Sequence, residues 1–340
     1  MQEAMLYERL EEQKVRCLLC AHRCLIKPGN TGICGVRENR QGTLYSLVYG
    51  KAISAAVDPI EKKPLYHYYP GSTAFSIATV GCNFRCQFCQ NADISQAPRE
   101  RSEWASWSQE LSPEQVVQLA QRERCQTIAY TYTEPTVFFE YAYDCALLAS
   151  QAGLKNVFVS NGFMTPQALD TIGENLHAAN IDLKGSDAFY KELCGGRQQP
   201  VLDTIVKMHG MGVWVEVTTL IIPGYNDDEQ TLRSIAEFLT SVDPTIPWHI
   251  SRFSPRYNLM DAPPTPVRTL HRAAEIGYES GLQYVYAGNV PGDRYEHTRC
   301  PKCGSISIHR YGYHIRNLMV NGNQCPTCGH RLAVVVSVNT

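Results

Sequence analysis

The chain has 340 residues, a hydrophobic content of 44% and a formal net charge of −2 at pH 7. This composition is typical of a globular protein with one large domain and small additions, and the balanced charge gives no overall attraction to nucleic acid. No apolar run approaches the roughly 18 residues that would span a membrane, and residues 1–14 lack the features of a signal peptide. We therefore expect a cytoplasmic protein without a membrane or nucleic-acid partner.

The C-terminal region could still present a local basic patch, formed by Arg299, Lys302, Arg310, Arg316 and Arg331.

Residues 1–70 predict an irregular, cysteine-rich N-terminal segment that begins with a helix at Glu3–Lys14. In a reducing compartment, cysteines at ligand spacing bind metals rather than form disulfides. The segment lacks the C-x2-C-x2-C-x3-C run of ferredoxins. We expect one four-thiolate site, which holds either zinc or an auxiliary iron–sulfur cluster. Its ligands would be Cys17, Cys20, Cys24 and Cys34.

From about residue 71 the chain alternates between short apolar runs and segments with helical periodicity. The helical segments carry start signals at Ser112-Pro113 and Thr165-Pro166 and an end signal at Gly153. About six such βα units predict an α/β fold, a partial (β/α)6 TIM-type barrel at residues 71–292. The runs that predict buried parallel strands are Phe75–Val80, Thr127–Tyr132, Asn156–Ser160, Ala179–Leu183, Val213–Ile222, Trp248–Phe253 and Tyr284–Ala287.

Three cysteines, Cys82, Cys86 and Cys89, follow the first predicted strand with C-x3-C-x2-C spacing. A [4Fe-4S] cluster is usually held by four thiolates, so three thiolates leave one iron with an open position that can activate a ligand. A structural zinc site is the alternative, but it normally needs four ligands in two pairs. We therefore interpret the triplet as the ligands of a [4Fe-4S] cluster.

The spacing of this triplet resembles the signature of the radical S-adenosylmethionine (SAM) superfamily. The motifs T-Y-T-E-P, V-S-N-G-F, I-D-L-K-G and I-I-P-G-Y-N-D resemble its glycyl-radical-enzyme activase branch, which includes pyruvate formate-lyase activating enzyme. The N-terminal cysteines, A-G-N-V-P-G and the terminal C-P-x-C-G pair are similar to AmmeMemoRadiSam-system radical SAM enzymes. This resemblance covers nearly the whole chain.

The resemblance implies a [4Fe-4S] cluster that reductively cleaves SAM to a hydrogen-abstracting 5′-deoxyadenosyl radical. It also implies an electron donor such as flavodoxin or ferredoxin, and association with AMMECR-type and Memo-type proteins.

Polar side chains follow several predicted strands, where ligands bind in parallel βα folds. Glu134 can accept hydrogen bonds from the SAM amino group, and Lys184 can face its carboxylate. Asn161 or Asp182 can hold the ribose, and Phe88 can pack on adenine. Each also has a structural interpretation: a turn, an ion pair or core packing. The expected SAM-binding residues are Phe88, Thr133, Glu134, Asn161, Asp182 and Lys184.

By resemblance, Thr133 and Glu134 occupy the position of the superfamily's Gly-Gly-Glu motif, and Asp182 and Lys184 match the activase D-x-K. The motif here is T-Y-T-E, which keeps the glutamate and lacks the glycines.

Two further side chains are candidates for catalysis. Cys194, in E-L-C-G-G, could relay a hydrogen atom if its loop faces the pocket. His249 lies on the sixth predicted strand and could face the barrel interior. Packing is the alternative for both.

Residues 293–340 follow a Pro291-Gly292-Asp293 turn and predict a small zinc-ribbon domain. Its C-x2-C…C-x2-C pattern is typical of a structural zinc site, and such a ribbon is usually structural or a docking element. The predicted zinc ligands are Cys300, Cys303, Cys325 and Cys328.

These features together predict a radical SAM enzyme, an activase-like oxidoreductase that abstracts hydrogen from a substrate such as a protein glycine. The alternative is radical modification of a small molecule, a peptide or RNA. A third hypothesis, a non-enzymatic iron–sulfur and zinc-binding protein, does not account for the polar residues at the strand ends.

Overall fold

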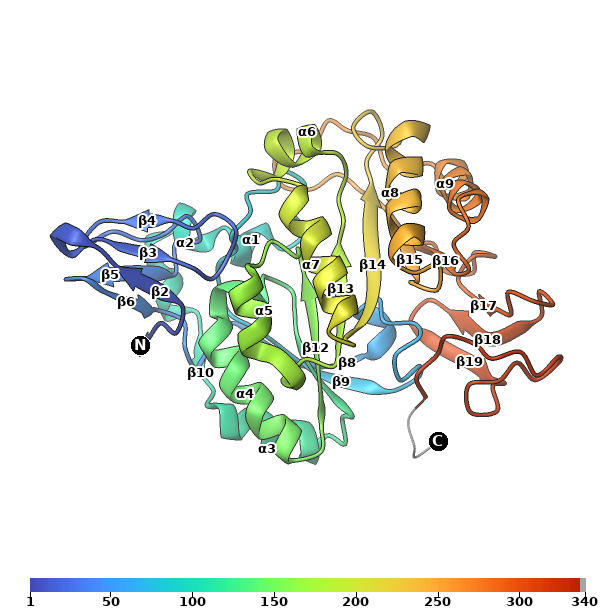
Figure 1. The fold of residues 1–340 in the computed structure, drawn as a ribbon, viewed down its shortest axis with the longest axis horizontal. Coiled ribbons are helices and arrows are strands. Elements are labelled where there is room, and N and C mark those ends of the chain that lie inside the picture. Colours follow the sequence, from blue (N-terminus) through green and yellow to red (C-terminus); the bar gives the residue numbers. More distant parts are fainter. Residues whose placement is uncertain (337–340) are drawn as a thin grey trace.

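The computed structural model describes residues 1–336 and centres on an eight-stranded sheet (Figure 1). The strand order is β16-β15-β14-β13-β12-β11-β9-β8; β8 is antiparallel to β9, and every other neighbouring pair is parallel. The strands are β8 (Ser54–Pro59), β9 (Thr73–Ala78), β11 (Thr127–Tyr130), β12 (Lys155–Ser160), β13 (Ala178–Asp182), β14 (Trp214–Ile221), β15 (Trp248–Arg252) and β16 (Val285–Gly288).

All seven predicted strands are present, and the mostly parallel sheet confirms the α/β class. Within residues 1–336, no strand pairing joins β8 to β16, so the sheet is open rather than a closed barrel.

Helices cross over between successive parallel strands, as βα units require (Figure 1). The start signals are confirmed: Ser112 accepts a hydrogen bond from Gln115 N at 3.3 Å, and Thr165 accepts one from Ala168 N at 3.2 Å. The helices are α1 (Ala92–Ser95), α2 (Ala97–Glu100), α3 (Pro113–Arg122), α4 (Phe139–Gln151), α5 (Pro166–Ile172), α6 (Asp187–Phe189), α7 (Gln199–Gly210), α8 (Glu229–Val242) and α9 (Val267–Glu279).

The inner side of the sheet is filled near the amino ends of its strands. Ile60, Leu65 and Tyr68, from the segment between β8 and β9, form one buried apolar cluster with one residue from each of four strands, none of them the last residue of its strand. The strand residues of this cluster are Ala74, Ala129, Val157 and Ala178. The carboxyl ends therefore remain as the side on which a ligand site can form.

The N-terminal segment consists of short antiparallel strands, and the predicted helix at Glu3–Lys14 is wrong. Tyr7–Arg9 pairs with Val15–Cys17, and only a 3-10 turn lies between them. This segment is polar and has no apolar stripe that would favour a helix. Its conformation is therefore determined by strand pairing with the next segment of the same chain. The strands are β1 (Gln2–Glu3), β2 (Tyr7–Arg9), β3 (Val15–Cys17), β4 (Leu25–Ile26), β5 (Arg37–Arg40) and β6 (Thr43–Ser46); β7 (Lys51–Ala52) pairs with β10 (Gln109–Glu110).

A three-stranded antiparallel sheet forms the C-terminal region: β17 (Thr298–Arg299), β18 (Ile306–Tyr311) and β19 (His314–Leu318). It packs on the segment before β9. Arg310 is 0% exposed and donates to Tyr66 O at 2.7 Å and to Thr298 Oγ1 at 2.8 Å. Val335 N donates to His67 O at 2.8 Å. Arg310 is therefore an internal contact and not part of a surface basic patch.

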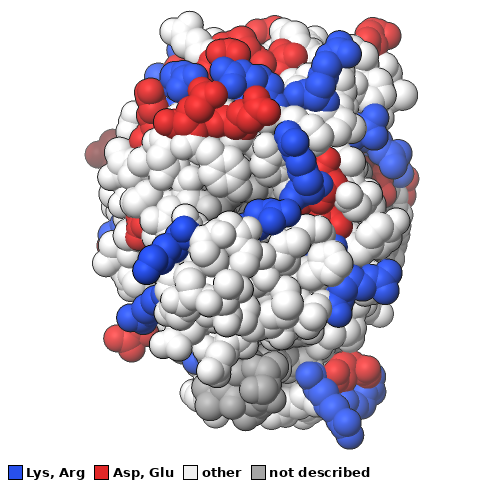
Figure 2. Space-filling model, turned by 90° about the vertical axis from the view of Figure 1, so that its right-hand side faces the viewer, with Lys and Arg blue, Asp and Glu red and all other residues white. Residues whose placement is uncertain are grey.

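The face shown in Figure 2 carries acidic and basic side chains close together, with uncharged surface between such groups. Elsewhere in the ion-pair network, Arg272 on α9 pairs with Glu229 on α8 and with Glu279 on its own helix. In the part of the chain that the structure describes, no helix combines the length and apolar character needed to cross a membrane.

We expect Arg310→Leu to lower the free energy of unfolding by about 3–5 kcal/mol, the usual cost of removing one partner of a buried ion pair. The substitution leaves the Tyr66 carbonyl without its donor and Glu61, which is 1% exposed, without the nearby guanidinium. Urea unfolding measures the effect. The exposed Arg316 is the matched control, and Arg316→Leu should cost about 0.5 kcal/mol or less. Equal losses in the two variants would contradict this packing.

Candidate functional site

The predicted cluster ligands lie on the loop that follows β9, at the carboxyl edge of the sheet. Cys86 is buried, and Cys82 and Cys89 are partly exposed. Cys82 Sγ accepts hydrogen bonds from Phe84 N (3.4 Å) and from Asn161 Nδ2 (3.7 Å). Cys89 Sγ lies 3.3 Å from Ser95 Oγ. Donors that face sulfur atoms suit an anionic sulfur centre, because they stabilise thiolate charge.

The triplet thiols would stay protonated without a bound cation. Burial raises the pKa of Cys82 and Cys89, and a hydrogen bond with Cys194, together with burial, raises that of Cys86. A metal centre supplies the positive charge that converts such thiols to thiolates.

Cys194 lies beside this triplet, in the π-helical turn Tyr190–Cys194, and is fully buried. Its backbone oxygen accepts a hydrogen bond from Arg85 N at 2.8 Å, so it packs under the cysteine loop. The sequence suggested a loop that faces the pocket, whereas the structure gives a buried thiol. A hydrogen-relay role for Cys194 stays a prediction.

The Glu134 carboxylate is buried and holds the carboxyl ends of β11 and β12 together. Oε1 accepts from Thr136 N (3.0 Å), Thr136 Oγ1 (2.6 Å) and Ser160 Oγ (2.8 Å), and Oε2 accepts from Asn161 N (2.8 Å). Burial raises the pKa of Glu134 although these hydrogen bonds lower it. The sequence did not reveal these contacts, since Ser160 is distant along the chain.

The Asn161 amide contacts the cysteine loop. Its Nδ2 donates to Asn83 Oδ1 at 2.7 Å as well as to Cys82 Sγ, and its Oδ1 accepts from Phe163 N at 3.0 Å. Both amide hydrogens thus have partners within the protein. Of the two residues expected to hold the ribose, Asp182 has the more accessible side chain, which is 36% exposed.

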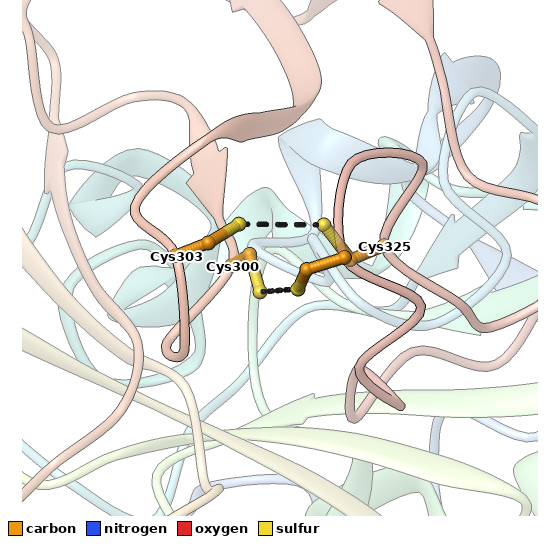
Figure 3. A group of neighbouring side chains, drawn as sticks. Cys300, Cys303 and Cys325 are labelled. Atoms are coloured by element: carbon orange, nitrogen blue, oxygen red, sulfur yellow. Dashed lines mark hydrogen bonds between the residues drawn. The ribbon is translucent and has the colours of Figure 1, made fainter.

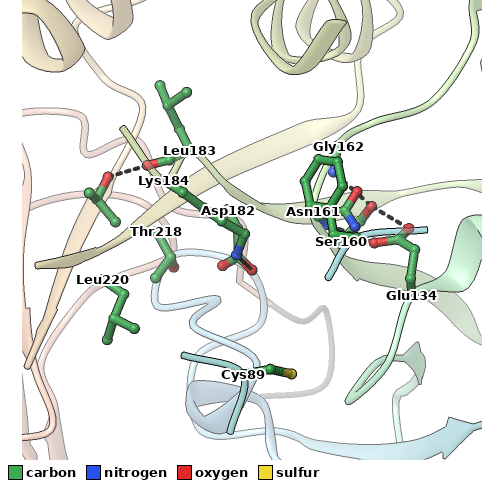
Figure 4. Close-up of polar contacts among 12 residues, drawn as sticks. Cys89, Glu134, Ser160, Asn161, Gly162, Asp182, Leu183, Lys184, Thr218 and Leu220 are labelled. Carbon is green, nitrogen blue, oxygen red and sulfur yellow. Dashed lines mark hydrogen bonds and ion pairs between the residues drawn. The ribbon is translucent and has the colours of Figure 1, made fainter. Parts of the chain in front are cut away.

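Asp182 and Lys184 lie at the end of β13 and form an ion pair of 2.7 Å. Burial lowers the pKa of Lys184, but the Asp182 carboxylate and the thiols nearby outweigh it, so the pKa is well above its usual value. Figure 4 shows this pair on one side and Glu134 and Asn161 on the other, with Cys89 below them in this view. The predicted residues are therefore brought to one edge of the sheet.

Phe88 and Thr133 both have structural partners. The Phe88 ring is buried against Phe189, with 5.6 Å between ring centroids, which is the core packing that the sequence left as its alternative. Thr133 Oγ1 donates to Thr79 O at 2.8 Å and joins β11 to β9. A role for either residue in SAM binding stays a prediction.

Tyr132, inside the T-Y-T-E motif, adopts a backbone conformation that favours glycine, with φ 63°. Such a conformation costs of order 1–3 kcal/mol for a residue other than glycine. The hydroxyl bonds to Asp58, and Lys63 Nζ lies 4.3 Å from the ring centroid. Asn91 Nδ2 donates to Tyr132 O at 2.7 Å. The motif therefore keeps a glycine-like backbone without a glycine.

His249 belongs to a buried polar network on the inner side of the sheet. Its Nε2 lies 2.7 Å from Glu216 Oε2, and the Glu216 carboxylate also accepts from Tyr66 N (2.9 Å) and His67 N (2.8 Å). These contacts join β14 and β15 to the segment on which the C-terminal sheet packs. A catalytic role for His249 stays a prediction.

The C-terminal quartet is assembled as a site for a single metal ion (Figure 3). The four sulfur atoms lie within 4.8 Å of one another, with 3.7 Å for both the Cys300–Cys328 and Cys303–Cys325 pairs. Thiolates that bind one zinc ion at about 2.3 Å in tetrahedral geometry are separated by about 3.8 Å. The spacing therefore suits zinc.

The chain is similar to several known proteins. An uncharacterized protein of Methanocaldococcus jannaschii is 45% identical over 339 residues, which cover 99% of this chain and 100% of that protein. A radical SAM methyltransferase from Sphaerobacter thermophilus has a similar fold, with a TM-score of 0.51 and 15% identity over 65% of this chain and 68% of that one.

A domain of pyruvate-formate lyase-activating enzyme from Bacteroides vulgatus has a TM-score of 0.42 and 20% identity, over 48% of this chain and 99% of that domain. The family description "Radical SAM superfamily" matches residues 76–239, which include the cysteine triplet and the strand ends described above. Residues 76–239 therefore form a domain that matches the radical SAM superfamily.

Proposed function

We propose that this enzyme uses a [4Fe-4S] cluster on Cys82, Cys86 and Cys89 to cleave SAM reductively and to abstract a hydrogen atom from its substrate. The observation that carries the proposal is the triplet at the carboxyl edge of a radical SAM domain, with Asn161 and Phe84 donating to Cys82 Sγ. The match of residues 76–239 to this superfamily supports both the cluster and SAM.

The residues present fit that cluster. Three thiols with raised pKa values would become thiolates on binding it, and the donors around Cys82 and Cys89 would stabilise their charge. When bound, the cluster supplies one-electron chemistry and an iron position open to SAM. The chain itself positions the ligands and limits the access of water.

The strand-end residues would orient SAM. Lys184 remains protonated at neutral pH and could face the SAM carboxylate, while Asp182 could accept hydrogen bonds from ribose. Glu134 Oε2 has one protein donor, so a second acceptor position remains for the SAM amino group. These roles agree with the activase-like order of the motifs along the chain.

The same motif order supports an activase-like reaction, in which hydrogen is taken from a glycine of a partner protein. A flavodoxin or ferredoxin would supply the electron. Association with AMMECR-type or Memo-type proteins and zinc at the C-terminal quartet belong to the same proposal.

We expect the anaerobically reconstituted, reduced protein to convert SAM to 5′-deoxyadenosine and methionine, and Cys86→Ala to remove both the cluster and this activity. Chromatography of the nucleoside products measures the activity, and iron analysis measures the loss of the iron that belongs to this one cluster. The control is Cys125→Ala, which removes a buried thiol outside the site and should leave both unchanged. Full cleavage of SAM by Cys86→Ala would refute the proposal.

We expect Glu134→Gln to act on both stability and SAM affinity. If the new amide faces the Asn161 N–H, two donors meet, and a buried donor without a partner costs about 1–3 kcal/mol. Loss of a charge-assisted bond to SAM should weaken binding about ten- to a hundred-fold, with cluster content nearly unchanged.

Thermal unfolding and SAM titration of the cluster spectrum separate these two effects. The exposed Glu174 gives the control Glu174→Gln, which should change neither. Lower stability with unaltered SAM affinity would show that Glu134 only joins β11 to β12.

A further inference from the structure

We propose that Cys17, Cys20, Cys24 and Cys34 hold an iron–sulfur cluster, not a zinc ion, in direct contact with the loop of the SAM-cluster cysteines. The four side chains line a single cavity between β3, β4 and the chain before β5. Cys17 and Cys34 are buried, and Cys20 and Cys24 are partly exposed. The assignment of the metal does not depend on the proposed function.

The cavity contains hydrogen-bond donors that have no acceptor. Within residues 1–336, the buried side-chain nitrogens without a partner are Arg37 Nε, Asn83 Nδ2 and Arg310 Nε. Arg37 and Asn83 both line this cavity. Buried donors are almost always paired, so two such donors at one place indicate a missing acceptor. Thiolates and inorganic sulfide are anionic acceptors that would satisfy them.

The spacing of the thiols distinguishes the two metals. Ligands of one zinc ion lie about 2.3 Å from it, so no two of them are more than about 4.6 Å apart. Among residues 1–336, the C-terminal quartet is the one group of three or more ligand atoms within 4.8 Å of one another.

Neither the N-terminal quartet nor the triplet Cys82, Cys86 and Cys89 meets that limit. In a cubane cluster each thiolate binds a different iron, so its cysteines lie farther apart than those of zinc. The N-terminal quartet therefore shares its wider spacing with the triplet rather than with the ribbon.

The two cysteine loops touch each other. His22, between Cys20 and Cys24, donates from Nε2 to Asn83 O at 2.9 Å. Arg99 donates from Nε to Ile33 O (2.8 Å) and from Nη2 to Cys82 O (2.5 Å), so one guanidinium bonds to both loops.

Gly81, next to Cys82, lies close against the chain that follows Cys34. A Cβ atom there would lie 3.3 Å from Cys34 O and 2.8 Å from Val36 Cγ1. Because the two loops are in contact, we expect clusters held on them to interact magnetically and to pass one electron from an external flavodoxin or ferredoxin between them.

The test is metal and sulfide analysis of the full-length protein after anaerobic reconstitution, with Mössbauer spectroscopy. Cys86→Ala should retain iron and acid-labile sulfide, because the N-terminal site is intact. Adding Cys20→Ser and Cys24→Ser to that variant should remove about two to four iron atoms and a similar amount of sulfide, while zinc stays at about one per chain. Cys125→Ser in the same background should leave the iron in place.

Three outcomes would overturn the proposal: Cys86→Ala without iron, iron that persists after the two serine substitutions, or a loss of zinc in place of iron. If the serine variant does not fold, the iron and sulfide content of Cys86→Ala still decides the matter.

Contact between the two cluster sites is tested by a separate measurement. The electron paramagnetic resonance spectrum of the reduced wild type should be broader than the sum of the single-site variants, and an unbroadened sum would exclude contact. None of these measurements depends on SAM cleavage.

Discussion

The arrangement of the site depends on the hydrogen bonds that converge on the Glu134 carboxylate. This one group fixes the backbone of Asn161, and the Asn161 side chain in turn bonds to Asn83 and Cys82. The backbone oxygen of Asn83 then accepts a hydrogen bond from His22 of the N-terminal segment. A buried carboxylate is costly unless donors surround it, and here four donors do so. The position of both cysteine loops therefore follows from a contact between two strand ends.

Strand prediction succeeded because buried parallel strands have a strong local signal. Runs such as Phe75–Val80 are apolar and bounded by polar or turn residues, and Ser112 and Thr165 precede proline at helix starts. The segment Glu3–Lys14 has no apolar periodicity, and its conformation depends on pairing with Val15–Cys17, which composition does not encode. The local sequence pattern thus predicted the strands and helix starts that local interactions determine, and it failed where pairing with another segment decides the conformation.

The same distinction applies to the candidate site. The spacing of Cys82, Cys86 and Cys89 identifies the triplet, since the residues are close in sequence. The groups that support it are distant: Asn161 and Arg99 reach the loop from other elements, and Cys194 arrives through the turn after β13. Contacts between residues so far apart in the sequence leave no local pattern from which they could be predicted. Arg310 is a second example. A single arginine in a strand is usually exposed, so its burial could not be predicted from the sequence.

The segment before β9 packs against four strands of the sheet through Tyr68, and the C-terminal sheet packs on that segment through the hydrogen bond from Arg310 to Tyr66. In the proposed reaction, SAM and the substrate would both reach the site at the carboxyl edge, and 5′-deoxyadenosine and methionine would leave by the same route. For a large substrate such as a protein, the adenosyl products would stay trapped beneath it until it departs, so the exit of the macromolecule would set the pace of each cycle.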